Sequence, residues 1–482
     1  MSRTVRDQRF DFRGGLNVAF TADATDATEF AVGKNIRRGL YAGLETRGST
    51  QRVHETPLAG GAPINGLFQW RPASGRQIVA IAGGNLYYKN EGDSEFTEVP
   101  ASFDTEAPVS FAPYIIGSIP ALYIADGDLR RWNGTTVEEI VGPAAKQVQV
   151  YKSRMFAIDG STTVYWSRID DPTDWASPNG GQSNVEIYDS DPLTALGVTG
   201  SSLLLAKKNT IARFTGTSAQ NIRVDQNTEG VSANVGSITP WMIPMDEALF
   251  FLSDRGPFIA TEAGVQPVGM KVEPVFDNAD LANFDRASLV FNRYRREVVC
   301  HIPAPEPLAY AFDARTQAWY GEWDYSGMFE VVSSCRYEMP DGKESILLGG
   351  EDGIVRVGDV RGDTARDDIL VDGRQGMPIT AELYFPNVFF GDPSMVKIMN
   401  GQNQHFGLDL GKSGRATVVV DSDIAGATSS QEIVSGGPGV KQYAVNFGGY
   451  GRRFGVRIRD SSGEVVRLHG WSLSARLSGR QM

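Results

Sequence analysis

One pattern of apolar and polar positions recurs seven times along the chain. Each copy is a short apolar strand, a turn rich in Gly or Asp, and a second strand that often ends in aromatic residues. The copies start roughly 35 to 50 residues apart, which is the length of a four-stranded propeller blade. The pattern predicts an all-β protein with a β-propeller of about six or seven blades. The seven copies are residues 78–88, 121–132, 154–166, 202–214, 248–260, 296–319 and 345–357.

The sequence outside these copies predicts two further parts. Residues 1–60 hold two weak strand patterns that do not match the blade pattern, and the blades occupy residues 61–360. After a charged segment the chain reads as strands separated by Gly and Ser turns, so residues 361–482 predict a small β-sandwich. We expect residues 1–60 to join this sandwich as a base. The predicted C-terminal strands are 379–389, 404–410, 415–420, 441–447, 453–459 and 464–473.

Near the C-terminus a strand alternates cleanly between apolar and basic side chains. Alternation with a period of two places the two sets on opposite faces of a sheet. The arginines either cover their own sheet or meet the carboxylates of a neighbour. The apolar set is Phe454, Val456 and Ile458, and the basic set is Arg453, Arg457 and Arg459.

Charge is unevenly distributed over the 482 residues, whose net charge is −12. Residues 91–200 hold 17 acids and six bases, whereas residues 451–482 hold seven arginines and two acids. We expect the acidic part to repel nucleic acid and the basic part to dock on an acidic partner. No stretch approaches the ~18 apolar residues that cross a bilayer, and the polar N-terminus predicts no secretory signal. The sequence therefore predicts folding in a cytoplasm without membrane insertion.

Candidate chemistry is sparse, and we expect no catalytic residue, metal or cofactor. The four histidines (His54, His301, His405 and His469) are isolated in sequence, which gives no support to a metal site or a His-based triad. Acid pairs occur in turns, where Asp is expected because its side chain bonds nearby backbone amides. These pairs lie at Asp126/Asp128, Asp170/Asp171/Asp174, Asp189/Asp191 and Asp421/Asp423.

Several phrases resemble one protein family. They are FRGGLNVAF (12–20), the stretch 34–49, YIADGDLRRWNG (123–134), WSRIDDPTDW (166–175) and the ending 453–480. Together they are similar to the tail nozzle β-propeller proteins of short-tailed bacteriophages, also described as tail tubular or head-to-tail stabilisation proteins. None of the phrases is a catalytic motif.

This resemblance implies a homohexameric ring in the virion tail, assembled in the host bacterial cytoplasm. Such a ring lies below the portal and adaptor rings, contacts tail fibres or spikes, and surrounds the channel through which double-stranded DNA leaves without specific binding. We therefore expect a non-enzymatic structural protein. From charge, the expected contacts with a partner ring are Arg37, Arg38, Arg453, Arg457 and Arg459.

Two alternatives stay open at this point. One is a glycan-degrading propeller enzyme with Asp126, Asp128 or Asp170 as acid–base residues, which requires two carboxylates about 5 to 9.5 Å apart in a cleft. The other is a receptor- or glycan-binding propeller with exposed Trp and Tyr at its loop ends.

Overall fold

The computed structural model describes most of the chain. It covers residues 4–477 except 22–23, 41–42, 73–74, 177, 179, 186–189, 217–222, 226–230, 280, 303–307, 372–375, 392–393, 400–403 and 425–427. Strands dominate the described part, and its one α-helix is α1 (Glu273–Asp277). The all-β prediction is confirmed.

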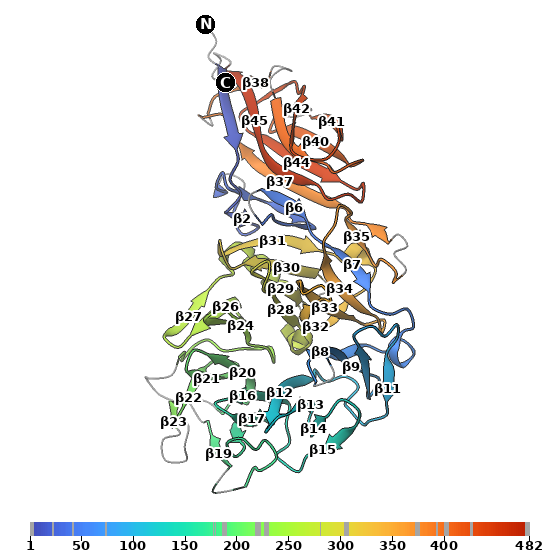
Figure 1. Ribbon diagram of the computed structural model, residues 1–482. Coiled ribbons are helices and arrows are strands. Elements are labelled where there is room, and N and C mark those ends of the chain that lie inside the picture. The colour runs from blue at the N-terminus through green and yellow to red at the C-terminus, as the bar shows by residue number, and fades with distance from the viewer. Residues whose placement is uncertain are drawn as a thin grey trace.

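Six separate four-stranded antiparallel sheets form blades of a propeller (Figure 1). The first two are β8 (Ile64–Trp70), β9 (Gln77–Ala82), β10 (Asn85–Asn90), β11 (Thr97–Val99), and β12 (Ser110–Ile116), β13 (Ile119–Ala125), β14 (Leu129–Trp132), β15 (Val137–Glu139). The third is β16 (Gln147–Tyr151), β17 (Arg154–Ile158), β18 (Thr163–Trp166), β19 (Gly181–Asn184), and the fourth β20 (Leu193–Thr199), β21 (Ser202–Lys207), β22 (Ile211–Thr215), β23 (Arg223–Asp225). The fifth is β24 (Ile243–Met245), β25 (Ala248–Ser253), β26 (Gly256–Thr261), β27 (Gly264–Pro267), and the sixth β32 (Val331–Glu338), β33 (Glu344–Gly350), β34 (Val355–Val360), β7 (Ser49–Arg52).

One further four-strand unit completes the ring. It is β28 (Ser288–Asn292), β29 (Glu297–Ile302), β30 (Leu308–Asp313) and β31 (Ala318–Trp323), and it is part of a nine-stranded sheet rather than a separate one. The inner strands β8, β12, β16, β20, β24, β28 and β32 are neighbours in that order, and β32 contacts β8.

The seven repeated sequence patterns fall on the middle of these units. The pattern at 78–88, for example, is the hairpin β9–β10, in which Leu86 pairs with Ile81. Its turn contains Gly83 and Gly84, with φ of +54° and +80°. Glycine adopts positive φ without a steric cost, which allows a two-residue turn between twisted strands. The local pattern therefore located each unit correctly.

The N-terminal region contributes one strand to the propeller. β7 pairs antiparallel with β34 as the outer strand of the last blade, with Gln51 opposite Val357. This strand lies within residues 1–60, which the sequence assigns entirely to the base. Its partner is about 300 residues away, so no local pattern could reveal the pairing.

Two short sheets pair β2 (Gly15–Leu16) with β3 (Glu29–Phe30) and β35 (Arg366–Asp367) with β36 (Met377–Pro378). The other remaining strands form two large sheets beside the propeller. The nine-stranded sheet continues from β31 through β4 (Val32–Lys34), β37 (Ala381–Val388), β44 (Phe454–Asp460), β40 (Arg415–Ser422) and β41 (Ser429–Val434). The other sheet runs through β42 (Lys441–Val445), β39 (Gln404–Asp409), β45 (Arg467–Leu477), β38 (Lys397–Met399) and β43 (Gly449–Gly451), with β1 (Thr4–Arg9), β5 (Ile36–Arg38) and β6 (Leu44–Thr46). We call these two sheets, without β28–β31, the base.

Side chains from both sheets of the base share one buried apolar cluster. Phe454, Val456 and Ile458 are buried on one face of β44, as the alternation predicts, together with Phe385 of β37 and Trp471 of β45. Residues 361–482 do not pair only among themselves, because N-terminal strands and β31 supply neighbours to both sheets. The β-sandwich predicted for residues 361–482 therefore stays a prediction.

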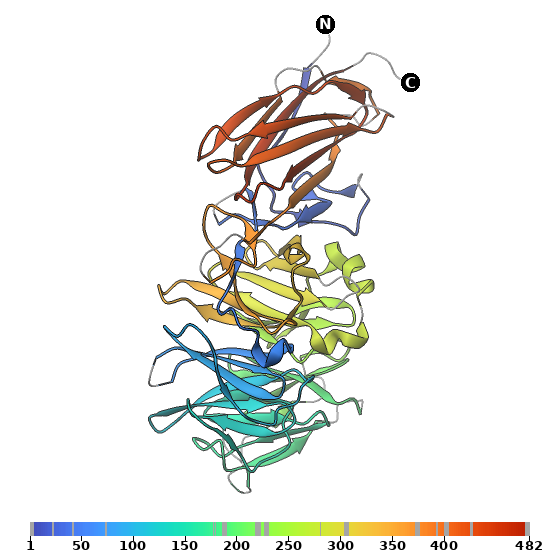
Figure 2. The same ribbon diagram turned by 90° about the vertical axis from the view of Figure 1, so that its right-hand side faces the viewer.

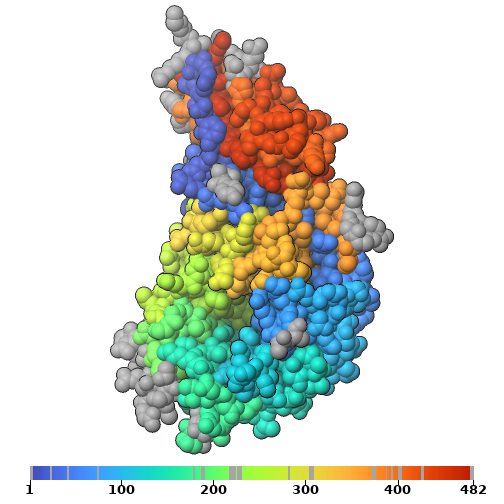
Figure 3. Space-filling model, in the orientation of Figure 1, coloured from blue at the N-terminus to red at the C-terminus, as the bar shows by residue number. Residues whose placement is uncertain are grey.

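The molecule is elongated, with the propeller at one end and the base at the other. Turned by 90°, the blades are seen from the side and the red and orange base continues the long axis (Figure 2). In the space-filling view, blue N-terminal residues lie between the base and the yellow blade (Figure 3).

Candidate functional site

A large cavity lies at one end of the propeller axis, where the inner strands begin. Its volume is about 1260 Å³. The wall comes from the segments before β8, β12, β16, β20, β24 and β28 and from turns of the middle hairpins, including Gly83, Asp126 and Gly160. The cavity is thus assembled from six segments spread over more than 200 residues of sequence.

Proline residues stiffen the rim of this cavity. Pro63, Pro108, Pro192 and Pro240 all line it, and each stands one to three residues before an inner strand. The proline ring fixes φ and reduces the conformations open to the loop. Proline therefore recurs in the sequence just before the inner strand of a blade, and this recurrence could have located the rim of the cavity.

Two aspartates on one side of the cavity have structural partners. Asp126 is buried, forms an ion pair with Arg130 at 2.5 Å, and accepts a hydrogen bond of 2.6 Å from the backbone N–H of Asp104. Asp104 in turn accepts bonds from the N–H groups of Glu106 (2.7 Å) and Ala107 (2.9 Å). These backbone bonds lower the pKa of Asp104, which keeps its carboxylate ionised.

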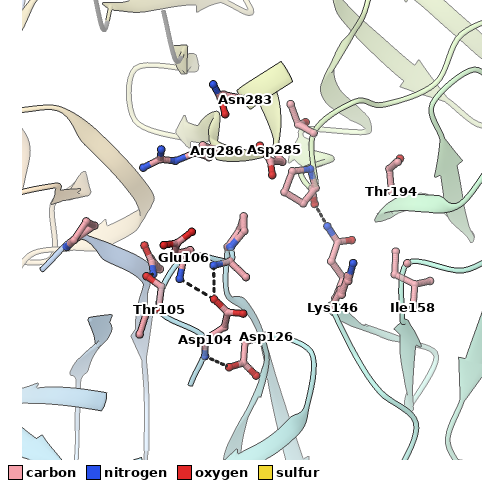
Figure 4. Close-up of a pocket in the computed structure, with 18 of the residues that line it drawn as sticks. Asp104, Thr105, Glu106, Asp126, Lys146, Ile158, Thr194, Asn283, Asp285 and Arg286 are labelled. Carbon is pink, nitrogen blue, oxygen red and sulfur yellow. Dashed lines mark hydrogen bonds between the residues drawn. The ribbon is translucent and has the colours of Figure 1, made fainter. Parts of the chain in front are cut away.

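Four other charged side chains line the cavity without an ion pair among the described residues. Glu106 lies on the same wall as Asp104, and Asp285 and Arg286 face it from the opposite wall (Figure 4). Lys146 projects from a third side, and all four residues are exposed. These four charges balance, because two are negative and two are positive, and Arg130 compensates the nearby Asp126.

An aromatic ring adjoins this charged region. Trp241 is half-buried and lines a small pocket that shares Asn65, Glu106, Asp285 and Arg286 with the large cavity. This small pocket holds only about 10 Å³, so no further side chain fits against the Trp241 ring there.

The acids that the enzyme alternative needs are not gathered in this cavity. Asp126 lines it, but Asp128 and Asp170 do not. The Asp128 side chain is 77% exposed and lies 3.2 Å from Arg130, whereas Asp170 sits in a turn with φ of +58°. Asp189, from another predicted acid pair, lies outside the described residues.

A second group of charged side chains lies where the base meets the propeller; we call it the waist network. Arg37 of β5 pairs with Glu297 of β29 at 2.9 Å and with Asp359 of β34. Arg295 lies 2.8 Å from Glu45 of β6 and 3.4 Å from Asp359. Arg467 of β45 extends the network by pairing with Glu45 at 3.2 Å and Asp409 at 3.0 Å. Alternating charges therefore connect one sheet of the base, the sheet that contains β45, to two propeller units.

The waist network changes the interpretation of Arg37. Its side chain is 1% exposed, so it does not lie at the surface as a contact with a partner ring requires. Arg37 and Arg38 are adjacent in the sequence, and their charge alone predicts that both lie at the protein surface. Burial is possible here because two carboxylates compensate the guanidinium. Arg38, its neighbour, is half-buried.

The three C-terminal arginines lie on the face of β44 that points away from the apolar cluster. Arg459 is 51% exposed and binds Glu382 of β37 through Nε (3.0 Å) and Nη2 (3.2 Å). The Arg457 guanidinium lies 4.7 Å from the centre of the Tyr384 ring. Arg453 is half-buried at the start of the row. At least two of them therefore meet groups of the adjacent strand in the same chain.

The described residues hold neither a cluster of metal ligands nor a membrane-spanning helix. No group of three or more His, Cys, Asp or Glu side chains is arranged to hold a metal ion in this part of the chain. Likewise, none of the helices in the described ranges is both long and apolar enough to cross a membrane.

Comparison with known proteins finds only distant likenesses. No protein-family model matches the chain, and no curated protein matches it. Among solved structures, the WD40 β-propeller domain of Doa1 is 10% identical, with a TM-score of 0.41 over 65% of this chain and 97% of that domain. A chain of the mitotic checkpoint complex is 11% identical, with a TM-score of 0.39 over 68% and 90% of the two chains.

Proposed function

We propose that this chain is a structural virion protein that forms the tail nozzle ring of a short-tailed bacteriophage. In this role it sits below the adaptor ring and serves as a conduit for the retention and ejection of double-stranded DNA. The sequence phrases at 12–20, 34–49, 123–134, 166–175 and 453–480 suggest the family. The geometry supports a mechanical role through the buried charges between the base and the propeller.

The waist network is the observation that carries the proposal. A ring subunit must hold its parts in one relative position under load, and a buried charge pair tolerates little displacement, since separating it leaves uncompensated charge in a low dielectric. Arg37, Glu297 and Asp359 are all nearly inaccessible, with side-chain exposures of 1%, 4% and 3%. The nine-stranded sheet also joins the two parts, because β4 pairs with β31 of the propeller on one side and with β37 of the base on the other.

The distribution of charge also fits a conduit. Each phosphate that Lys or Arg neutralises adds salt-dependent affinity, which would slow the passage of DNA. A chain of net charge −12 avoids this drag. We therefore expect no measurable binding of a 30-base-pair duplex at physiological salt, and submicromolar binding would contradict the conduit.

The proposal is tested by the mass of the protein in solution. Light scattering of the purified chain, alone and mixed with the phage adaptor ring, should give a species of about six copies in at least one of the two samples. A monomer that ignores the adaptor would contradict the proposal.

The arginine row offers a sharper version of this test. Replacing Arg453, Arg457 and Arg459 together by Ser should weaken ring formation while the monomer stays folded, because the row lies on the open face of a sheet in the base. A matched control replaces three exposed arginines of the propeller, Arg71, Arg168 and Arg296, each of which also has one carboxylate partner. If the two triple variants form rings equally well, the arginine row is not part of the contact between subunits.

A further inference from the structure

We propose that the hairpin β35–β36 is a strap by which the base holds the last blade of the propeller closed. β7, the outer strand of that blade, comes from the N-terminal region and pairs with β34, and the chain then continues into the first blade. A contact that keeps β7 in place therefore keeps the ring of blades closed. The strap lies within one chain, so it does not depend on the nozzle proposal.

The root of the strap is fixed in the base. Its two ends are joined, because the Ile379 N–H donates to the carbonyl oxygen of Ala365 (2.9 Å). Both residues are fully buried and form a small apolar cluster with Val465. The Ala365 N–H also donates to the Gly463 carbonyl (2.9 Å), which ties this end to the segment between β44 and β45. From this root, residues 366–371 extend along β7 (Figure 1).

Backbone hydrogen bonds attach the strap to the outer edge of β7. Ile369 lies opposite Gln51 in a parallel bridge. Its N–H donates to the Thr50 carbonyl (2.9 Å), and its carbonyl accepts from the Arg52 N–H (2.8 Å). In the described part of the chain, the other separate four-stranded sheets end at their outer strands β11, β15, β19, β23 and β27. Removing β7 from its blade therefore breaks two sets of backbone hydrogen bonds instead of one.

Two buried carboxylates of the strap bind arginines of the last blade and of the segment that leads into it. Asp367 is fully buried, and its Oδ1 accepts a hydrogen bond of 2.8 Å from Arg47, two residues before β7. The Oδ1 atom of Asp368 accepts hydrogen bonds of 2.8 Å from both Arg52 in β7 and Arg356 in β34. One carboxylate of the strap thus holds both strands of the pair that closes the blade. Separating these strands would leave a buried charge uncompensated, which is unfavourable.

Hydrogen–deuterium exchange of the full chain, followed by mass spectrometry, tests the strap. Asp368→Asn removes the charge that both arginines bind, so the amides of β7 and β34 should exchange at least about tenfold faster, while those of β17 in the third blade stay unchanged. Asp352→Asn is the matched control, because Asp352 also pairs with Arg356 (2.6 Å) but lies outside the strap, in the turn before β34. Unchanged exchange in β7, equal acceleration by both variants, or equal acceleration in all blades overturns the proposal.

A second variant removes the strap altogether. Because Ala365 and Ile379 are hydrogen-bonded neighbours, residues 366–378 can be replaced by Asn-Gly, a two-residue turn that joins adjacent antiparallel strands. Arg47→Met is added so that no buried guanidinium is left without Asp367. The amides of β7 should again exchange at least about tenfold faster, while those of β44 and β45 in the base keep their rates. If β7 stays protected, or if the base exchanges faster to the same extent, the hairpin is not a strap.

Discussion

At the scale of single residues, burial decides which ionisable groups matter for stability. His301 lies on β29 with 5% of its surface exposed, and its Nε2 is 2.8 Å from the hydroxyl of Tyr325. Burial lowers the pKa of His301 to about 3, so the folded protein keeps this imidazole neutral. In the unfolded chain the same group takes up a proton near pH 6.5.

This difference predicts a loss of stability in mild acid. As the pH falls below about 6.5, His301 becomes protonated in the unfolded chain. In the folded protein it stays neutral until the pH is near 3, so the free energy of unfolding decreases over this range. Between pH 7 and pH 5 the unchanged protein should lose about 2 kcal/mol more than His301→Gln, by urea denaturation. His405 is exposed, and His405→Gln serves as the matched control variant. An identical loss in all three proteins would contradict the prediction.

At the scale of elements, the waist network joins strands that no hydrogen-bond ladder connects. Arg37 extends from β5 in the base to β29 and β34 in the propeller. Burial raises the pKa of Glu297, and the charge of Arg37 opposes that rise. The guanidinium of Arg37, together with that of Arg295, therefore compensates two carboxylates that are buried side by side.

Removing this guanidinium should be costly. Arg37→Met leaves Glu297 and Asp359 without their shared partner, so we expect the free energy of unfolding to fall by about 3 to 5 kcal/mol. Arg38→Met is the matched control, since Arg38 is half-buried on the same strand, and it should change stability by less than about 1 kcal/mol. Denaturant unfolding of the two variants gives both numbers. Similar values would mean that the waist network contributes little.

At the scale of the whole molecule, the base is built from both ends of the chain. β1 pairs with β45 so that Thr4 lies opposite Arg476, and β4 lies between β31 and β37. β6 also pairs with β45, through Leu44 and Leu468. The C-terminal residues therefore lack three strand neighbours when they stand alone.

This arrangement predicts that the fragment 361–482 does not fold by itself. Its near-ultraviolet circular dichroism should lack the signal of packed aromatic rings, and its denaturation should show no cooperative transition. Joining residues 4–48 behind residue 477 through a short linker restores β1, β4, β5 and β6, and should restore a cooperative transition. A cooperative transition in the fragment alone would show that the C-terminal strands form an independent sandwich.

The sequence by itself determined the blades, because each middle hairpin depends on neighbouring residues. Apolar alternation selects strands, and glycines with positive φ, such as Gly83 and Gly84, close the turns between them. The same reasoning placed Phe454, Val456 and Ile458 in a core and the arginines on the other face of β44. The weak strand β41 was missed because its side chains are mostly polar or exposed.

Only the tertiary structure decided which distant segments meet. β7 closes the last blade with β34, Arg37 finds its carboxylates about 260 and 320 residues away, and six loops surround one cavity. A strand edge or a charged side chain accepts any partner of matching chemistry, so its local sequence does not specify which one it meets. Closure of the ring makes that choice, since it fixes the places of all inner strands together.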